Sequence, residues 1–212
     1  LMNFRHAVIP EIKQLSELTA IAFNDYALYQ KTIRQTFRHE AAYQQFIQRL
    51  HDVHIATNVH QQKVFIVEEK NKILSIVILE ADTLPKTTLW QYIKNGGLKM
   101  LPYFFHNNLA QFLAVLDEAE KLPQKQSQAN WHVNLLAVNP DNQGQHIGSR
   151  TLTDFVIPYV KSKGAQSLSL ITNTQHNVTF YQKNNFKITD ERTLNFKGQQ
   201  VKNWSLVQML AD

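Results

Sequence analysis

The sequence contains no cysteine, which excludes a disulfide framework, a thiolate zinc site and a cysteine nucleophile together. Long apolar runs are absent as well. The β-branched run Ile73–Leu79 has only the length of a strand, so we expect no membrane partner. Residues 1–10 lack the basic segment followed by an apolar run that marks a secretory signal. These absences favour a cytoplasmic protein.

Charge of either sign is also scarce, since only 18% of the 212 residues are charged whereas 43% are apolar. A chain with this composition can bury a sizeable core, and its length predicts one domain over residues 1–212. The net charge of +5 allows an anionic partner, either nucleic acid or a phosphorylated cofactor. Because Lys and Arg are scattered rather than clustered, we expect no nucleic-acid partner.

The first 80 residues alternate between strand and helix patterns. Phe4–Ile9 predicts a strand, and Ile12–Ala22 and Ala41–Ile55 place apolar residues at helical spacing. Val64–Val67 and Ile73–Leu79 are β-branched runs joined by charged residues, which is the pattern of a hairpin. Residues 81–130 then interrupt the β pattern with a helical insertion that ends in a polar exit loop at 123–129.

The last 80 residues return to alternating strands and helices. The predicted elements are a strand at Trp131–Val138, a helix at 147–163 kinked by Pro158 and closed by Gly164, a strand at Ser167–Ile171, a helix at Thr174–Lys183, and a hairpin of strands around 186–189 and Trp204–Leu210 with its turn at Gly198. The order of these elements predicts an α/β fold with a mixed sheet.

A polar loop with two glycines joins the strand Trp131–Val138 to the following helix. This arrangement aims free backbone N–H groups and the positive end of a helix at one point, where a diphosphate fits. Within Gln143–Ser149, Gly144 and Gly148 let the backbone approach phosphates closely, and Ser149 adds a hydroxyl donor. The dinucleotide and P-loop patterns are both missing, which disfavours NAD and ATP.

The residues around this loop resemble the acetyl-coenzyme A signature of the GNAT N-acetyltransferases, V-x-P-x-x-Q/R-x-x-G-x-G/A. Val138, Pro140, Gln143 and Gly148 match it, whereas His146 stands where the first glycine usually lies. Since histidine tolerates the left-handed region better than most residues, we expect that backbone conformation there.

The second half of the family pattern, N-x-x-x-N-x-x-F-Y-x-x-x-G-F, is matched downstream. The matching residues are Asn173, Asn177, Phe180, Tyr181 and Phe186, with Asn185 in place of the glycine. Asparagine is the next best residue for a left-handed helix cap. Two half-motifs in the right order identify residues 131–186 as the core of a GNAT domain. The strand at 131–138 with the long insertion most resembles the puromycin acetyltransferase-like branch.

The resemblance implies a mostly antiparallel sheet flanked by helices, with acetyl-CoA as cosubstrate and no metal. The residues it assigns to cofactor binding are Leu136, Val138, Gln143, Gly144, Gln145, His146, Ile147, Gly148, Ser149, Asn173 and Asn177. Backbone groups of Leu136 and Val138 would bind the pantetheine arm, and the loop would hold the pyrophosphate. Each of these roles has a purely structural alternative. Leu136 and Val138 can be core residues, and the loop can be an ordinary entry to a helix.

The resemblance also implies direct attack of an amine on the thioester, with the Val138 N–H stabilising the oxyanion. Tyr181 is the candidate general acid, although an aromatic on a short helix can equally serve packing. The general base is open. Relatives often carry a glutamate where this chain has Asn134, so His132 and Glu80 are fallbacks, as is an ordered water.

The acceptor implied by the family is a primary amine of a small molecule or peptide. By analogy the aromatics of 24–37 and of the insertion flank its pocket, namely Tyr26, Tyr29, Trp90, Tyr103, Phe104 and Phe105, most of which we expect in the core. A GNAT module that binds acyl-CoA without turnover is the main alternative, and a basic nucleic-acid-binding domain is the next. The sequence leaves room for a homodimer.

Overall fold

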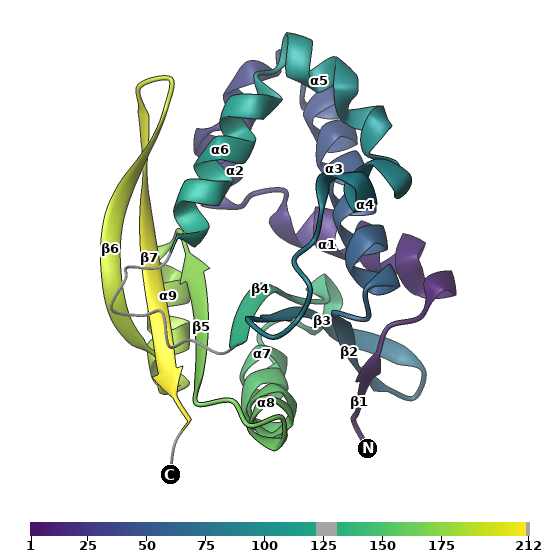
Figure 1. Cartoon of the computed structure of the whole chain (residues 1–212), viewed down its shortest axis with the longest axis vertical. Coiled ribbons are helices and arrows are strands. Elements are labelled where there is room, and N and C mark those ends of the chain that lie inside the picture. The colour runs from purple at the N-terminus through teal and green to yellow at the C-terminus, as the bar shows by residue number, and fades with distance from the viewer. Residues whose placement is uncertain (122–130, 211–212) are drawn as a thin grey trace.

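The computed structural model describes residues 1–121 and 131–210. Its strands form one seven-stranded sheet in the order β1-β2-β3-β4-β5-β7-β6, in which only the β4 and β5 neighbours run parallel (Figure 1). The strands are β1 (Asn3–His6), β2 (Val64–Glu69), β3 (Lys72–Ala81), β4 (Trp131–Val138), β5 (Ser167–Thr172), β6 (Lys187–Phe196) and β7 (Gln199–Met209). The predicted mixed and mostly antiparallel sheet is confirmed.

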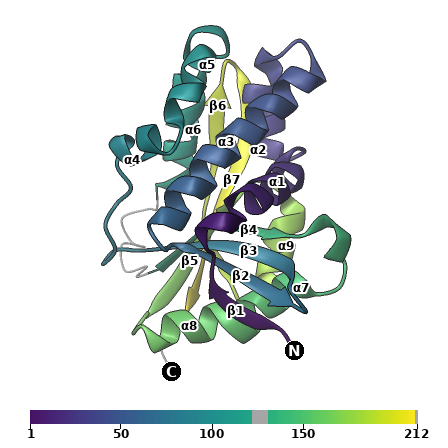
Figure 2. The ribbon, with the colours of Figure 1, turned by 90° about the vertical axis from the view of Figure 1, so that its right-hand side faces the viewer.

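Helices lie on both faces of this sheet. They are α1 (Ile12–Phe23), α2 (Ala27–Lys31), α3 (Glu40–His60), α4 (Leu89–Lys94), α5 (Leu101–His106), α6 (Leu109–Glu120), α7 (Ile147–Arg150), α8 (Ile157–Ser162) and α9 (Gln175–Lys183). Figure 2 shows α1 and α3 on one side of strands β2 to β4 and α8 on the other. None of the helices in the described ranges combines the length and the apolar character that crossing a membrane requires.

The central strands read as continuous apolar runs because both of their faces are covered. Every residue of Val64–Val67 and of Ile73–Leu79 is buried, and strands covered on both faces lose the alternation of a half-exposed sheet. Two apolar clusters flank these strands. One includes α1 and α3 residues, and the other includes residues of α8, α9 and β7.

The helix after β4 is not regular along its length. It begins as α7, continues as a π-helical segment over Thr151–Val156 and ends as α8, which carries Pro158 in its first turn. The irregular segment thus precedes Pro158, which stands in the first turn of the regular α8, where a missing N–H is tolerated. Gly164, with φ +78°, follows the helix end as expected.

The insertion is helical, as predicted, and supplies α4, α5 and α6. The predicted exit loop at 123–129 lies outside the described residues. The expectation that most of the aromatics flanking the acceptor pocket are core is wrong for three of the four in the insertion. Tyr103 is buried, but Trp90, Phe104 and Phe105 are exposed. Short helices at the edge of the fold bury only the face that meets α3 and α6, which leaves the opposite ring-bearing face in solvent.

Strand β4 changes its pairing in the middle. It pairs with β5 only from Trp131 to Val133, so the two strands separate beyond that point. On its other edge, Leu79 pairs with Val133 and Ile78 with Leu135, which leaves Asn134 as the extra residue of a bulge. Bulges of this kind re-aim side chains and are frequent beside active sites. The separation of β4 from β5 and the bulge both begin at Asn134.

Candidate active site

The loop after β4 is tied back to the sheet by Asn139. Its backbone N–H donates to the Leu74 carbonyl at 2.8 Å, and its side-chain amide donates to the Ile73 carbonyl at 3.0 Å. Its side-chain oxygen accepts the N–H of Asp141 at 3.2 Å, which starts a short turn over Pro140–Asn142. These bonds fix where the loop leaves the sheet.

Two residues of this loop have left-handed backbone conformations. Gly144 has φ +76°, and a Cβ built there would meet nothing within 4 Å. His146 has φ +59°, so the conformation expected for the histidine that replaces the family glycine is confirmed. The space over Gly144 is open, and the backbone there can approach a bound group closely.

The start of α7 presents free backbone donors beside this open space. The first backbone bond of the helix runs from the Arg150 N–H to the His146 carbonyl at 3.0 Å. The N–H groups of Ile147, Gly148 and Ser149 therefore have no acceptor within the helix. Such donors at a helix start bind anions. The Ser149 hydroxyl already accepts a bond from the Asn184 amide at 3.1 Å.

The edge of β4 next to this loop is also open. Leu136 and Val138 are half-buried and lie beyond the last residue of β4 that pairs with β5. An unpaired strand edge can bind an extended amide-bearing chain through its backbone. The residues present thus fit coenzyme A, whose diphosphate suits the loop and whose amide-containing arm suits the edge.

Tyr181 lies on α9 and is buried between the rings of Phe180 and Phe186, at centroid distances of 5.0 and 5.7 Å. Burial, with a smaller contribution from Tyr26, raises the pKa of Tyr181 above its ordinary value. The hydroxyl is therefore protonated at neutral pH, as a proton donor must be. The structure is equally consistent with a packing role, because the ring of Tyr181 contacts the rings of Phe180 and Phe186.

The two asparagines that resemble the second half-motif have different surroundings. Asn173 is buried, and its amide donates to the Lys202 carbonyl at 2.9 Å and to Asn203 Oδ1 at 3.1 Å. Its Oδ1 accepts the Tyr26 hydroxyl at 2.7 Å. The side chain is thus engaged within the protein, so a cofactor contact would use its backbone. Asn177 is half-buried, and its N–H bonds the Thr174 hydroxyl at the start of α9.

The two fallback bases, His132 and Glu80, face each other across β4 and β3. His132 Nδ1 lies 2.9 Å from the Ser169 hydroxyl, and burial lowers the pKa of His132 to about 4. The Glu80 carboxylate lies 3.9 Å from the Lys63 ammonium. Each fallback therefore has a protein partner.

A carboxylate that the sequence argument missed lies next to Asn134. Glu120 is the last residue of α6, and its Oε1 accepts the Asn134 amide at 3.3 Å. Desolvation by the surrounding protein, followed by repulsion from Glu80 and Asp117, raises the pKa of Glu120 to about 7, although the residue itself is exposed to solvent. The one available signal in the sequence was its position at the end of α6, four residues after the partly buried Leu116.

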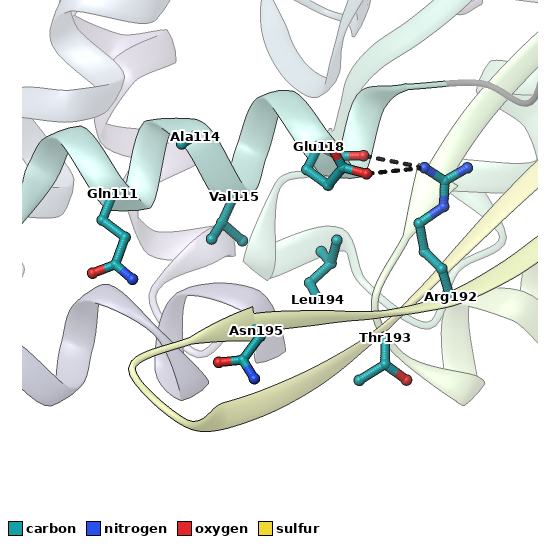
Figure 3. Close-up of a pocket in the computed structure, with 8 residues that line it drawn as sticks. All are labelled: Gln111, Ala114, Val115, Glu118, Arg192, Thr193, Leu194 and Asn195. Atoms are coloured by element: carbon teal, nitrogen blue, oxygen red, sulfur yellow. Dashed lines mark hydrogen bonds and ion pairs between the residues drawn. The ribbon is translucent and has the colours of Figure 1, made fainter.

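A surface pocket lies elsewhere, between α6 and β6 (Figure 3). It is lined by Gln111, Ala114, Val115, Glu118, Arg192, Thr193, Leu194 and Asn195. Glu118 and Arg192 point toward each other there, and their charged groups lie 3.7 Å apart. None of the lining residues belongs to the loop Gln143–Ser149 or to α9, so this pocket is separate from the candidate site. Within residues 1–121 and 131–210, no group of His, Asp and Glu is arranged to hold a metal.

Comparison with known families gives one match. The sequence matches the family described as "Acetyltransferase (GNAT) domain" over residues 83–206, more than half of the chain. The match includes the loop after β4 and all of α9. No curated protein matches the sequence significantly.

Several solved structures share the fold over nearly the whole chain. An agmatine N-acetyltransferase in its apo form has a TM-score of 0.62 and 16% identity, covering 99% of this chain and 100% of that chain. The polyamine N-acetyltransferase of Drosophila melanogaster, which forms N-acetylagmatine, has a TM-score of 0.56, 14% identity and coverages of 99% and 100%. PaiA N-acetyltransferase from Thermoplasma acidophilum, solved with coenzyme A, has a TM-score of 0.58, 12% identity and coverages of 99% and 99%. At these identities the likeness concerns the fold alone.

Proposed function

The chain belongs to the GNAT acetyltransferase family, and we propose that it transfers an acetyl group from acetyl-CoA to the primary amine of a small molecule or peptide. The observation that carries this proposal is the loop Gln143–Ser149, whose free N–H groups and open left-handed turn lie beside the unpaired edge of β4. When bound, acetyl-CoA supplies the thioester carbonyl that the amine attacks.

Each part of the site has a role in this proposal. The N–H groups of the loop bind the pyrophosphate, and the backbone of Leu136 and Val138 binds the pantetheine arm. The Val138 N–H would stabilise the charge that develops on the thioester carbonyl oxygen in the transition state. Tyr181, kept protonated by burial, donates a proton to the leaving sulfur. Asn173 and Asn177 support the cofactor side of the site.

The acceptor is an amine, for which the carboxylates of Glu80 and Glu120 supply negative charge on the α3 and α6 side of β4. Two of the structural neighbours are described as acting on agmatine or polyamines. Cationic amines of this kind are therefore the first acceptors to test. We place the reaction in the cytoplasm, since the chain has no cysteine to oxidise, and without a nucleic-acid partner.

The deciding experiment measures CoA binding and thiol release separately. We expect calorimetry to show that CoA binds, and we expect thiol release from acetyl-CoA to depend on one member of a panel of agmatine, spermidine, amino acids, peptides and aminoglycosides. Absence of CoA binding would reject the proposal. CoA binding without acetylation of any amine would favour a non-catalytic acyl-CoA-binding module, for which Asn134 in place of the usual glutamate is the supporting observation.

A further inference from the structure

We propose that Glu120, at the end of α6, accepts the proton that the acceptor amine loses, and that Asn134, His54 and Asn58 form the hydrogen-bond chain that positions its carboxylate. This inference rests on the proposed acetyl transfer. It assigns the proton acceptor to a residue of the inserted helices rather than to the strand on which the family places a glutamate.

The hydrogen bonds of this chain all run in one direction. The Asn58 amide nitrogen lies 3.4 Å from His54 Nδ1, and His54 Nε2 lies 3.0 Å from Asn134 Oδ1. The Asn134 amide then donates to Glu120 Oε1 at 3.3 Å. Since an amide NH₂ only donates and an amide oxygen only accepts, His54 must carry its proton on Nε2. Every donor in the chain therefore points toward the carboxylate.

The end of helix α6 is also hydrogen-bonded to strand β7. The Ala119 carbonyl accepts the Asn203 amide at 3.0 Å, and Asn203 Oδ1 accepts the Asn173 amide at 3.1 Å. Asn173 in turn accepts the Tyr26 hydroxyl, and the same Tyr26 contributes to the raised pKa of Tyr181. Hydrogen bonds thus link the end of α6 with Asn173 and Tyr26.

The charges around Glu120 suit a proton acceptor. Glu80 on β3 and Asp117 on α6 face it with negative charge, and the phenols of Tyr29 on α2 and Tyr92 on α4 lie near enough for Glu120 to raise their pKa values. Desolvation by the surrounding protein is the largest cause of the raised pKa of Glu120, about 7, and the repulsion from Glu80 and Asp117 adds to it. A carboxyl group with a pKa near the working pH is ionised in a large fraction of the molecules and is still basic enough to accept a proton.

The neighbouring groups are less suited to this role. Both ring nitrogens of His54 are engaged in the chain, and burial lowers the pKa of His54. Glu80 lies 3.9 Å from the ammonium of Lys63. Asn134, at the bulge, has no basic atom. Glu120 is the carboxylate that lies next to the point where β4 and β5 separate.

The proton transfer balances with the groups already assigned. The amine nitrogen forms a bond to the carbonyl carbon, and the bond from that carbon to sulfur breaks. The proton lost by the nitrogen passes to the Glu120 carboxylate, directly or through one water molecule. The sulfur leaves as a thiol with the proton from Tyr181, and exchange with solvent restores both residues.

The first test compares Glu120→Gln with Glu118→Gln. Both changes remove a carboxylate from the last turns of α6, but Glu118 faces Arg192 in the pocket between α6 and β6 (Figure 3) and also pairs with Lys121. With an acceptor from the amine panel, we expect Glu120→Gln to lose about a hundredfold or more in kcat and Glu118→Gln to stay within about twofold. The kcat/KM of the wild type should rise as the pH increases through about 7, and this rise should be absent from the pH profile of Glu120→Gln. Equal effects of the two variants would overturn the assignment.

A second variant moves the carboxylate instead of deleting it. We expect the double variant Glu120→Gln with Asn134→Glu to recover about tenfold or more of the lost kcat, because it returns a carboxylate to the same space. The single variant Asn134→Ala should shift the rise of kcat/KM to higher pH, since it removes the donor that favours the ionised form. An unshifted rise would mean that Asn134 does not position Glu120.

A third measurement does not need an acceptor. Carboxyl carbons labelled with ¹³C in glutamate are titrated by NMR in the CoA-bound protein, and Glu120→Gln identifies the resonance of residue 120. We expect a pKa near 7, whereas titration near the ordinary value of about 4.3 would overturn the assignment. A wild-type protein that does not bind CoA would reject the acetyltransferase proposal itself, which separates the two failures.

Discussion

The ring of Phe180 closely approaches the position that a Cβ would take at Gly148. A Cβ built on Gly148 would come within 3.1 Å of Phe180 Cζ and 3.5 Å of Val138 Cγ2. Strand β4 and helix α9 cannot easily move away from position 148, because residues of both are packed in the same apolar cluster. A side chain at position 148 therefore crowds Phe180, and one larger than a methyl group must push the start of α7 away from β4 and α9.

We predict that Gly148→Val abolishes CoA binding, because the added side chain must push α7 away and displace the N–H donors at its start. Calorimetry with CoA measures the effect, and circular dichroism confirms that the fold is kept. Gly164→Asn is the matched control, since Gly164 has φ +78° with no atom within 4 Å of its Cβ position and lies after α8. Unchanged CoA affinity in Gly148→Val would contradict the pyrophosphate assignment.

Tyr181→Phe should lower kcat by about a hundredfold or more while leaving CoA affinity nearly intact, because a donated proton matters in the transition state and not in the bound ground state. Tyr159→Phe removes a hydroxyl from a half-buried ring on α8 and serves as the control. Steady-state kinetics with a true acceptor and calorimetry with CoA provide the two readouts. A loss of only about twofold would mean that Tyr181 serves packing alone.

The raised pKa of Glu120 predicts a pH-dependent effect on stability. A carboxyl whose pKa is raised in the folded state favours its neutral form there, so its contribution to stability is present at low pH and is lost as pH rises through about 7. Glu120→Gln is neutral at every pH. Its Tm relative to wild type should therefore be more favourable at pH 8.5 than at pH 5.5. Glu118→Gln controls for the change in net charge, and an equal pH trend in both variants would count against a raised pKa at Glu120.

His51 predicts an acid sensitivity of the fold. It is 1% exposed on α3, and neither ring nitrogen has a hydrogen-bond partner among the described residues. Burial, with a smaller effect of His54, lowers the pKa of His51 to about 3. Because the unfolded chain binds a proton at higher pH than the folded one does, this residue makes stability fall as pH drops below about 6.5.

We therefore expect His51→Phe to gain stability over wild type, by more at pH 5 than at pH 8. The rings of Phe23 and Tyr29 already surround the site, and the change removes two buried polar atoms that cost about 1–3 kcal/mol each when unpaired. Thermal unfolding at the two pH values measures the difference. His60→Phe, at the exposed end of the same helix, is the control. A His51→Phe protein as acid-sensitive as wild type would show that another group causes the loss.

Most of the fold could be predicted from the sequence because its signals are local. The β-branched runs at 64–67 and 73–79 and the apolar stripes of α1, α3 and α6 each lie within one element, and the structure confirms them. The exposure of Trp90 and Phe105 could not be predicted in this way. An aromatic residue shows by its type that it can be buried, but whether a second element covers it depends on how the insertion packs.

The sequence by itself determined the backbone conformation of the loop, because a residue's backbone preferences act within a few positions. His146 and Asn185 are both left-handed as expected, at φ +59° and +68°, and a Cβ at Gly148 would lie only 3.1 Å from Phe180 Cζ. The surroundings of Asn134 were decided only by tertiary structure. His54 lies 80 positions before it and Glu120 lies 14 positions before it, on two helices whose packing brings both side chains to the bulge of β4. The pKa of Glu120 depends on burial and on Glu80, which lies on another strand, and no local pattern encodes either.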